Sequence, residues 1–87
     1  MTYRVSYYWN ADGGKYVSSN AIFYVADDVV SHMKSSLHAN YNTDGFGVKI
    51  ERKFEEENEW SPVYEGPLND IVLLGLTCML KGIHFDH

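Results

Sequence analysis

The sequence predicts a single α+β domain in which a four-stranded antiparallel sheet carries two helices on one face. Two stretches of the chain alternate between apolar and polar side chains, which is the period of a half-buried strand, and two more read as extended strands next to them. Two further stretches are expected to be helices, one with apolar residues at helical spacing and one that is apolar nearly all round. The stretches follow one another in the order ββαββα. The simplest packing for that order is one antiparallel sheet with both helices on the same face.

The whole chain, residues 1–87, is expected to form one small α+β domain, because 87 residues cannot bury a second core. Hydrophobic residues make up 45% of the chain and aromatic residues 15%, which is enough apolar surface to drive folding. The composition therefore excludes the disordered class of protein.

The first two strands are expected to form a β-hairpin. Apolar residues alternate along the first strand at Tyr3, Val5, Tyr7 and Trp9. Turn residues follow at 10–14, and a second extended stretch covers residues 15–25, with a bulge predicted at 18–20. Most of the hairpin aromatics are expected in core and sheet packing. Tyr8, on the polar side of the first strand, is expected to be the most exposed of them.

The first helix is predicted to begin near Asp27 and Asp28, either of which could cap it and both of which suit the helix dipole. Its apolar stripe follows spacings of three and four at Val30, Met33, Leu37 and Tyr41. Residues 40–47 contain turn signals that end the helix.

The third and fourth strands are predicted at residues 48–54 and 60–65, on either side of an acidic turn. Pro62 lies within the fourth strand. Because proline has no backbone N–H to donate, this strand is expected at a sheet edge or at a bulge.

The last helix, residues 68–80, has only three polar side chains, Asn69, Asp70 and Thr77. Asn69 or Asp70 is expected to cap its start, and Gly82 to end it in the left-handed conformation. A helix that is apolar nearly all round either lies centrally over the sheet or meets another chain with its far face. We expect the central position. If the far face meets another chain instead, Leu73 and Leu80 are the candidate residues for a homodimer interface.

The charge balance argues against nucleic acid and anionic membranes as direct partners. Seven Lys and Arg residues stand against twelve Asp and Glu residues, giving a formal charge of −5. Binding to nucleic acid depends on cations that displace counterions from phosphates, and anionic lipid surfaces attract the same cations. A negative field instead speeds the encounter with basic protein partners.

Three features predict a cytoplasmic protein without a membrane span. The longest apolar run, residues 71–80, is about half the ~20 residues that a span requires. Residues 1–9 lack the basic start and apolar run of a signal peptide. The single cysteine, Cys78, cannot form a disulfide within the chain.

No residue pattern indicates catalysis, and we expect no catalytic residue, metal or cofactor. Cys78 lies among apolar residues and is expected to be a buried, unreactive core cysteine. The tail at residues 84–87 carries His and Asp side chains, but chain ends lack the rigidity that a metal site needs. Residues 12–15 contain glycines and a lysine without P-loop spacing, and they are expected to form a hairpin turn.

Residues 54–60 read FEEENEW and place four carboxylates between two aromatic residues. One interpretation is a solvated turn, since like charges at a loop tip cost little in water. The other is a negative surface that binds a basic protein. The acidic candidates for that surface are Glu51, Glu55, Glu56, Glu57, Glu59, Glu65, Asp27 and Asp28, and the aromatic candidates are Tyr8 and Trp60.

In size, acidity and lack of catalytic motifs, the chain resembles small phage-encoded proteins that block host defence nucleases. The resemblance is one of composition and assigns no role to any residue. It implies a non-enzymatic inhibitor, a nucleic-acid mimic that blocks a basic protein or complex that handles nucleic acid. The alternative hypothesis is a structural or regulatory domain that forms a homodimer through its apolar C-terminal helix.

Overall fold

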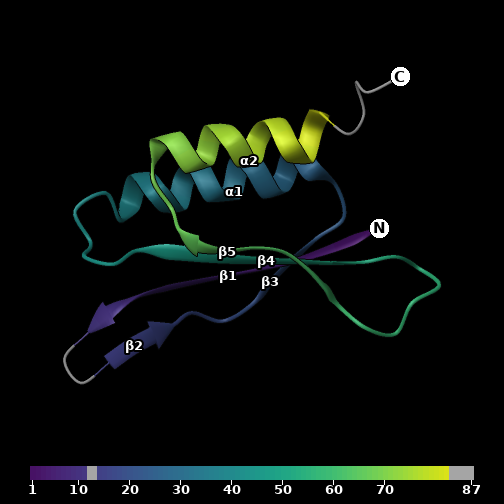
Figure 1. The fold of residues 1–87 in the computed structure, drawn as a ribbon, viewed down its shortest axis with the longest axis horizontal. Coiled ribbons are helices and arrows are strands. Elements are labelled where there is room, and N and C mark those ends of the chain that lie inside the picture. The colour runs from purple at the N-terminus through teal and green to yellow at the C-terminus, as the bar shows by residue number, and fades with distance from the viewer. Residues whose placement is uncertain (12–13, 83–87) are drawn as a thin grey trace.

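The computed structural model describes residues 1–11 and 14–82 and confirms the order ββαββα, with the predicted second strand divided in two (Figure 1). The strands are β1 (Thr2–Ala11), β2 (Gly14–Val17), β3 (Ala21–Phe23), β4 (Gly47–Lys53) and β5 (Ser61–Pro67), and the helices are α1 (Ala26–Ala39) and α2 (Asp70–Gly82). The tip of the first hairpin, residues 12–13, lies outside the described residues.

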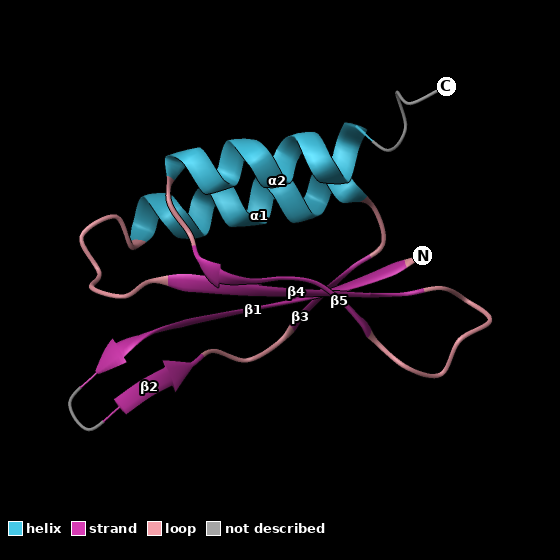
Figure 2. Ribbon diagram, viewed as in Figure 1, coloured by secondary structure: helices cyan, strands magenta, loops and turns pink. Residues whose placement is uncertain are grey.

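The sheet is antiparallel throughout, with the order β2-β1-β4-β5, and β3 pairs with β1 alongside β2. β1 and β4 are therefore the inner strands, while β5 and the β2–β3 pair form the two edges. Both helices cover the same face of this sheet, and the other face, which we call the open face, carries no helix (Figure 2). The predicted fold class is confirmed.

The predicted bulge at residues 18–20 separates β2 from β3. β1 has two residues between those that pair with Val17 and Ala21, whereas the opposite strand has three, 18–20. Ser18 fixes this bulge to β1 through two hydrogen bonds with the Tyr7 backbone. Its backbone N–H donates to the Tyr7 carbonyl (2.7 Å), and its hydroxyl accepts a hydrogen bond from the Tyr7 N–H (2.9 Å).

Pro62 lies both on an edge strand and beside a bulge, as the sequence predicts. Ile50 pairs with Tyr64, but the next residue of β4 pairs with Pro62, so that Val63 is the extra residue of β5. The missing N–H of the proline therefore interrupts no regular ladder inside the sheet.

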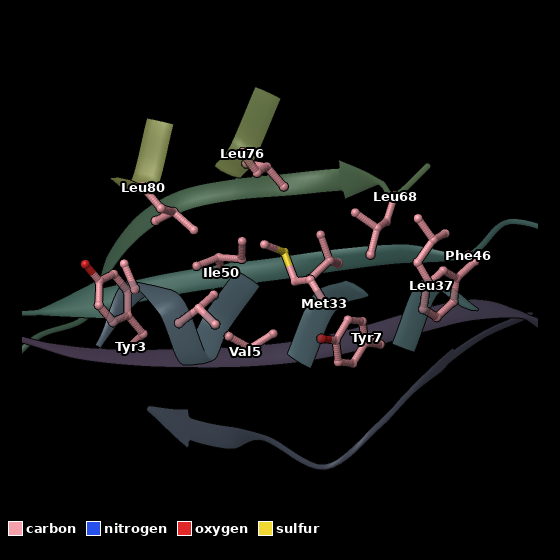
Figure 3. Close-up of a cluster of buried hydrophobic side chains, with 13 residues drawn as sticks. Tyr3, Val5, Tyr7, Met33, Leu37, Phe46, Ile50, Leu68, Leu76 and Leu80 are labelled. Atoms are coloured by element: carbon pink, nitrogen blue, oxygen red, sulfur yellow. The ribbon is translucent and has the colours of Figure 1, made fainter. Parts of the chain in front are cut away.

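The core lies between the sheet and the two helices (Figure 3). Val5, Met33 and Ile50 are completely buried there. Alternate residues of a strand point to opposite faces, so Tyr3, Val5 and Tyr7 of β1 point toward the helices. α1 contributes the buried stripe Ala26, Val29, Met33 and Leu37.

The ends of the helices differ in part from the prediction. The N-cap of α1 is Val25, which makes no side-chain cap hydrogen bond, and Asp27 and Asp28 lie in the first turn, so the predicted acidic cap is wrong. At α2 the cap is confirmed, because the Asn69 side-chain oxygen accepts a hydrogen bond from the Val72 N–H (2.9 Å). Gly82 belongs to α2, and the one positive φ among the described residues, 67°, is at Gly45. The predicted left-handed stop at Gly82 is therefore wrong.

The prediction that α2 is the central helix is also wrong. α1 buries four residues against the rest of the chain, while α2 buries only Leu76 and Leu80. Ile71 and Leu74, on the far side of α2, are 83% and 67% exposed. A helix with apolar residues on every side offers no contrast from which its inward face could be predicted.

Candidate protein-binding surface

Residues 54–60 form the loop between β4 and β5, which we call the glutamate loop. The Glu57 N–H donates to the Phe54 carbonyl (3.0 Å) and closes a turn. The four loop glutamates, Glu55, Glu56, Glu57 and Glu59, are all exposed. Ion pairs among the side chains of residues 1–9 and 17–82 join Arg4 to Glu51 and Lys81 to Asp27, so none of the four is paired with those side chains.

The two cations that precede the loop contact its aromatic ends. The Arg52 guanidinium lies 5.7 Å from the centre of the Phe54 ring, and the Lys53 ammonium lies 5.1 Å from the Trp60 ring. Such contacts keep a cation over an aromatic face. The loop carboxylates therefore stay available although two cations are adjacent in sequence.

Two other predicted acidic residues lie on the open face of the sheet beside cations. Arg4 Nε is 2.9 Å from Glu51 Oε1, and this hydrogen bond is the main cause that lowers the pKa of the Glu51 carboxyl below its usual value. Glu65 stands opposite Lys49 in the β4–β5 register. The structure thus separates Glu51 and Glu65 from the unpaired carboxylates of the glutamate loop.

The two predicted aromatic residues are half-buried on the open face. The Tyr8 ring occupies the space that a Cβ on Gly47 would need. The Arg4 guanidinium lies 4.4 Å from the centre of the Trp60 ring. The expectation that Tyr8 is the most exposed aromatic of the hairpin is wrong, because Tyr24 is 73% exposed. The glycine on the next strand lets Tyr8 lie flat against the sheet.

Asp27 and Asp28 lie at the same end of the molecule as the glutamate loop. Tyr3 pairs with Phe23 of β3 and with Arg52 of β4, so these three residues form one row across the sheet. Beyond that row, the chain continues from β3 into the first turn of α1 and from β4 into the glutamate loop. Figure 1 shows the start of α1 and this loop at the end marked N.

Exposed apolar side chains lie at this end as well. Met1, Tyr24, Val25 and Phe54 are 39%, 73%, 52% and 45% exposed. An open hollow of about 410 Å³ is lined by Met1, Tyr24 and Val25 among others, and beside it Lys81 Nζ is 2.9 Å from Asp27 Oδ1. We call Met1, residues 24–28 and the glutamate loop together the acidic end. The alternation of polar and apolar residues locates strands but does not predict that the apolar residues of the acidic end lie near one another. Only the pairing of the strands brings them together.

Of the two predicted dimer residues, the structure contradicts Leu80 and leaves Leu73 untested. Leu80 is 1% exposed and belongs to the core, and Leu73 is partly buried against that core. Cys78, expected in the core, is exposed. Apart from Asp70, the exposed members of α2 follow helical spacing on its far side, and we call them the α2 face: Ile71, Leu74, Gly75, Cys78 and Met79.

A buried polar contact between β1 and α1 escaped the sequence analysis. The Tyr7 hydroxyl lies 2.7 Å from His32 Nδ1, and the two rings stack with centres 5.5 Å apart. Tyr7 is 6% exposed, and this burial raises the pKa of its hydroxyl to about 12. The contact joins α1 to the sheet beneath it.

Within the described residues, no three His, Cys, Asp or Glu side chains come together as metal ligands would. The tail at residues 84–87 lies outside that part of the chain. Among the described helices, none has the length and apolar character needed to cross a membrane. Comparisons with protein-family models, curated proteins and solved structures gave no match for this chain.

Proposed function

We propose that the protein is a non-enzymatic inhibitor that uses its acidic end to bind and block a basic protein. The observation that supports this most directly is the set of four exposed glutamates of the glutamate loop, unpaired among the described residues. Unpaired carboxylates in one loop attract a cationic surface and raise the rate of encounter with it.

The apolar side chains of the acidic end support a protein as the partner. Protein interfaces combine an apolar centre with a polar rim. Tyr24, Val25 and Phe54 are all about half exposed or more, and carboxylates from α1 and from the glutamate loop flank them. A basic protein with an apolar patch between its cations fits this arrangement.

The partner we propose is a protein or complex that handles nucleic acid. Such a protein places Lys and Arg where phosphates bind. Carboxylates at Glu55, Glu56 and Glu57, joined by Glu59, can occupy those cations and exclude the nucleic acid. The formal charge of −5 disfavours direct binding of nucleic acid by the chain itself. We place this activity in the cytoplasm, since a chain with one cysteine lacks the disulfides typical of small secreted domains.

The test is capture of partners from a nuclease-treated lysate with two variants of equal charge. Glu56→Gln/Glu57→Gln and the control Asp44→Asn/Glu65→Gln each change the formal charge from −5 to −3, because each removes two carboxylates. The wild type and the control should retain basic proteins at low salt and release them at high salt. The loop variant should retain much less. Salt-independent retention, or equal retention by the two variants, contradicts the proposal.

The α2 face favours a second candidate function, that of a structural or regulatory domain that acts as a homodimer. Ile71 and Leu74 are the observation behind it, at 83% and 67% exposed. The two candidates use different surfaces, so neutralising the glutamate loop tests only the first.

A further inference from the structure

The α2 face is a continuous apolar surface on the outside of the helix layer. Ile71, Leu74 and Met79 are 83%, 67% and 39% exposed, and Gly75 and Cys78 lie between them. Contiguous exposed apolar patches of this kind mark interaction sites. We propose that a second copy of this chain covers the face, in a two-fold symmetric dimer whose α2 helices pack antiparallel.

The charge on α2 selects a second copy over the basic partner proposed for the acidic end. α2 carries one acidic residue, Asp70, and one basic residue, Lys81, so its charges cancel. A basic protein gains no electrostatic attraction from this helix. A two-fold contact instead requires a surface that fits itself. An apolar stripe with opposite charges at its two ends meets that requirement.

The positions of the two charges select the antiparallel arrangement. Asp70 and Lys81 are eleven residues apart, about three helical turns, and therefore lie on the same flank of α2 at opposite ends. A two-fold axis perpendicular to the helices brings Asp70 of one copy beside Lys81 of the other, whose ammonium also pairs with Asp27 of its own α1 (2.9 Å). A parallel pair brings like charges toward each other. The antiparallel pair also places each positive helix N-terminus beside a negative C-terminus.

Small residues at the centre of the face allow the two helices to approach closely. A Cβ at Gly75 would meet no atom within 4 Å, so its surface is open. Cys78 lies one turn further along the same face. Packed helices have axes about 8–10 Å apart depending on the side chains at the contact, and small residues favour the short end of that range. Ile71 and Leu74 would then fill the space beside the crossing point.

The size of the face predicts a reversible dimer. A helix of 13 residues is about 20 Å long. Its face alone buries less than the roughly 800 Å² per partner of a standard stable interface. We therefore expect the dimer to dissociate on dilution.

The first experiment measures mass by light scattering or sedimentation over a dilution series. The wild type should approach twice its chain mass of 10.0 kDa when concentrated and return to the monomer when dilute. Leu74→Glu should give a monomer with wild-type circular dichroism. The control, Ile22→Glu, alters a 44% exposed residue of β3 opposite Arg4 and should still dimerise. A wild type that stays monomeric at its highest concentration overturns the proposal, as does a dimer that Leu74→Glu leaves intact.

A second experiment tests the geometry. Cys78 is the single cysteine, so a short bismaleimide should join two copies through it, and Leu74→Glu should abolish the product. Asp70→Lys should weaken the dimer. Adding Lys81→Asp should restore it by exchanging the two charges, with Asp27→Lys included so that residue 81 keeps an oppositely charged partner on α1. Failure of that rescue overturns the antiparallel arrangement. Glu56→Gln/Glu57→Gln should dimerise like the wild type, which separates this result from the fate of the acidic end.

Discussion

The two helices cover the same face of the sheet, but α1 exposes polar side chains to solvent and α2 exposes apolar ones. α1 buries Ala26, Val29, Met33 and Leu37 and turns Ser31, Lys34, Ser35 and His38 outward. α2 buries Leu76 and Leu80 and turns apolar residues outward. The apolar side of α1 is therefore buried within its own chain, whereas α2 has apolar side chains that a single copy of the chain leaves exposed.

The largest expected effect compares two leucines of α2. Leu80 is 1% exposed and Leu74 is 67% exposed. Leu80→Ala should lower the free energy of unfolding by about 2–5 kcal/mol, because it leaves a cavity in the core. Leu74→Ala should change it by less than about 0.5 kcal/mol. Urea unfolding of the dilute, monomeric chain measures both, and equal losses would mean that the α2 face packs against the chain's own core.

The next effect concerns the polar contact that joins α1 to the sheet. The unfolded chain releases the Tyr7 proton near pH 10, whereas the folded state holds it up to a pKa of about 12. The stability that this proton contributes is therefore intact below pH 10 and is lost as pH rises through 12. The free energy of unfolding should therefore fall between pH 10 and pH 12 in the wild type, and in Tyr7→Phe this fall should be smaller by on the order of 1–3 kcal/mol.

Unfolding free energies measured against pH test this expectation, with Tyr24→Phe as the exposed control. At neutral pH, Tyr7→Phe should also lower stability by about 0.5–1.5 kcal/mol, because the hydrogen bond to His32 is lost. An alkaline slope identical to that of the wild type contradicts the role of the buried hydroxyl.

The smallest effect concerns the helix caps, where α2 has a side-chain cap and α1 has none. Asn69→Ala should lower the free energy of unfolding by about 1 kcal/mol, since the Val72 N–H loses its acceptor. Val25→Asn should raise it by up to about 1 kcal/mol, because Val25 already has the extended backbone of an N-cap, with φ −134° and ψ 146°. Thermal unfolding of both variants measures the difference. A destabilised Val25→Asn would show that the contacts of Val25 outweigh a cap.

The parts of the fold that the sequence predicts are those where polar and apolar side chains contrast. Tyr3, Val5 and Tyr7 alternate with residues of the open face, and all three are in the core. Pro62 marks an edge because its chemistry removes a hydrogen-bond donor. α2 lacks such contrast, and so its sequence does not show that Leu80 faces the core and Cys78 faces solvent.

The acidic residues likewise have some features that the sequence predicts and others that it does not. The exposure of Glu55, Glu56 and Glu57 follows from charge and from their place in a turn. The ion pair of Glu51 does not, because its partner Arg4 is 47 residues away and only the β1–β4 register places them together. Local pattern thus predicts which side chains meet solvent, while pairing across the sheet decides which charges remain free.

The two sheet edges have a consequence for how copies of the chain meet. One edge is broken at residues 18–20, and the other carries Pro62 and Pro67, which cannot donate a backbone hydrogen bond. Neither edge of the sheet therefore offers a strand from a neighbouring molecule an uninterrupted row of backbone hydrogen-bonding groups. Growth into fibres by strand addition is therefore opposed, and concentrated protein should form discrete particles rather than aggregates.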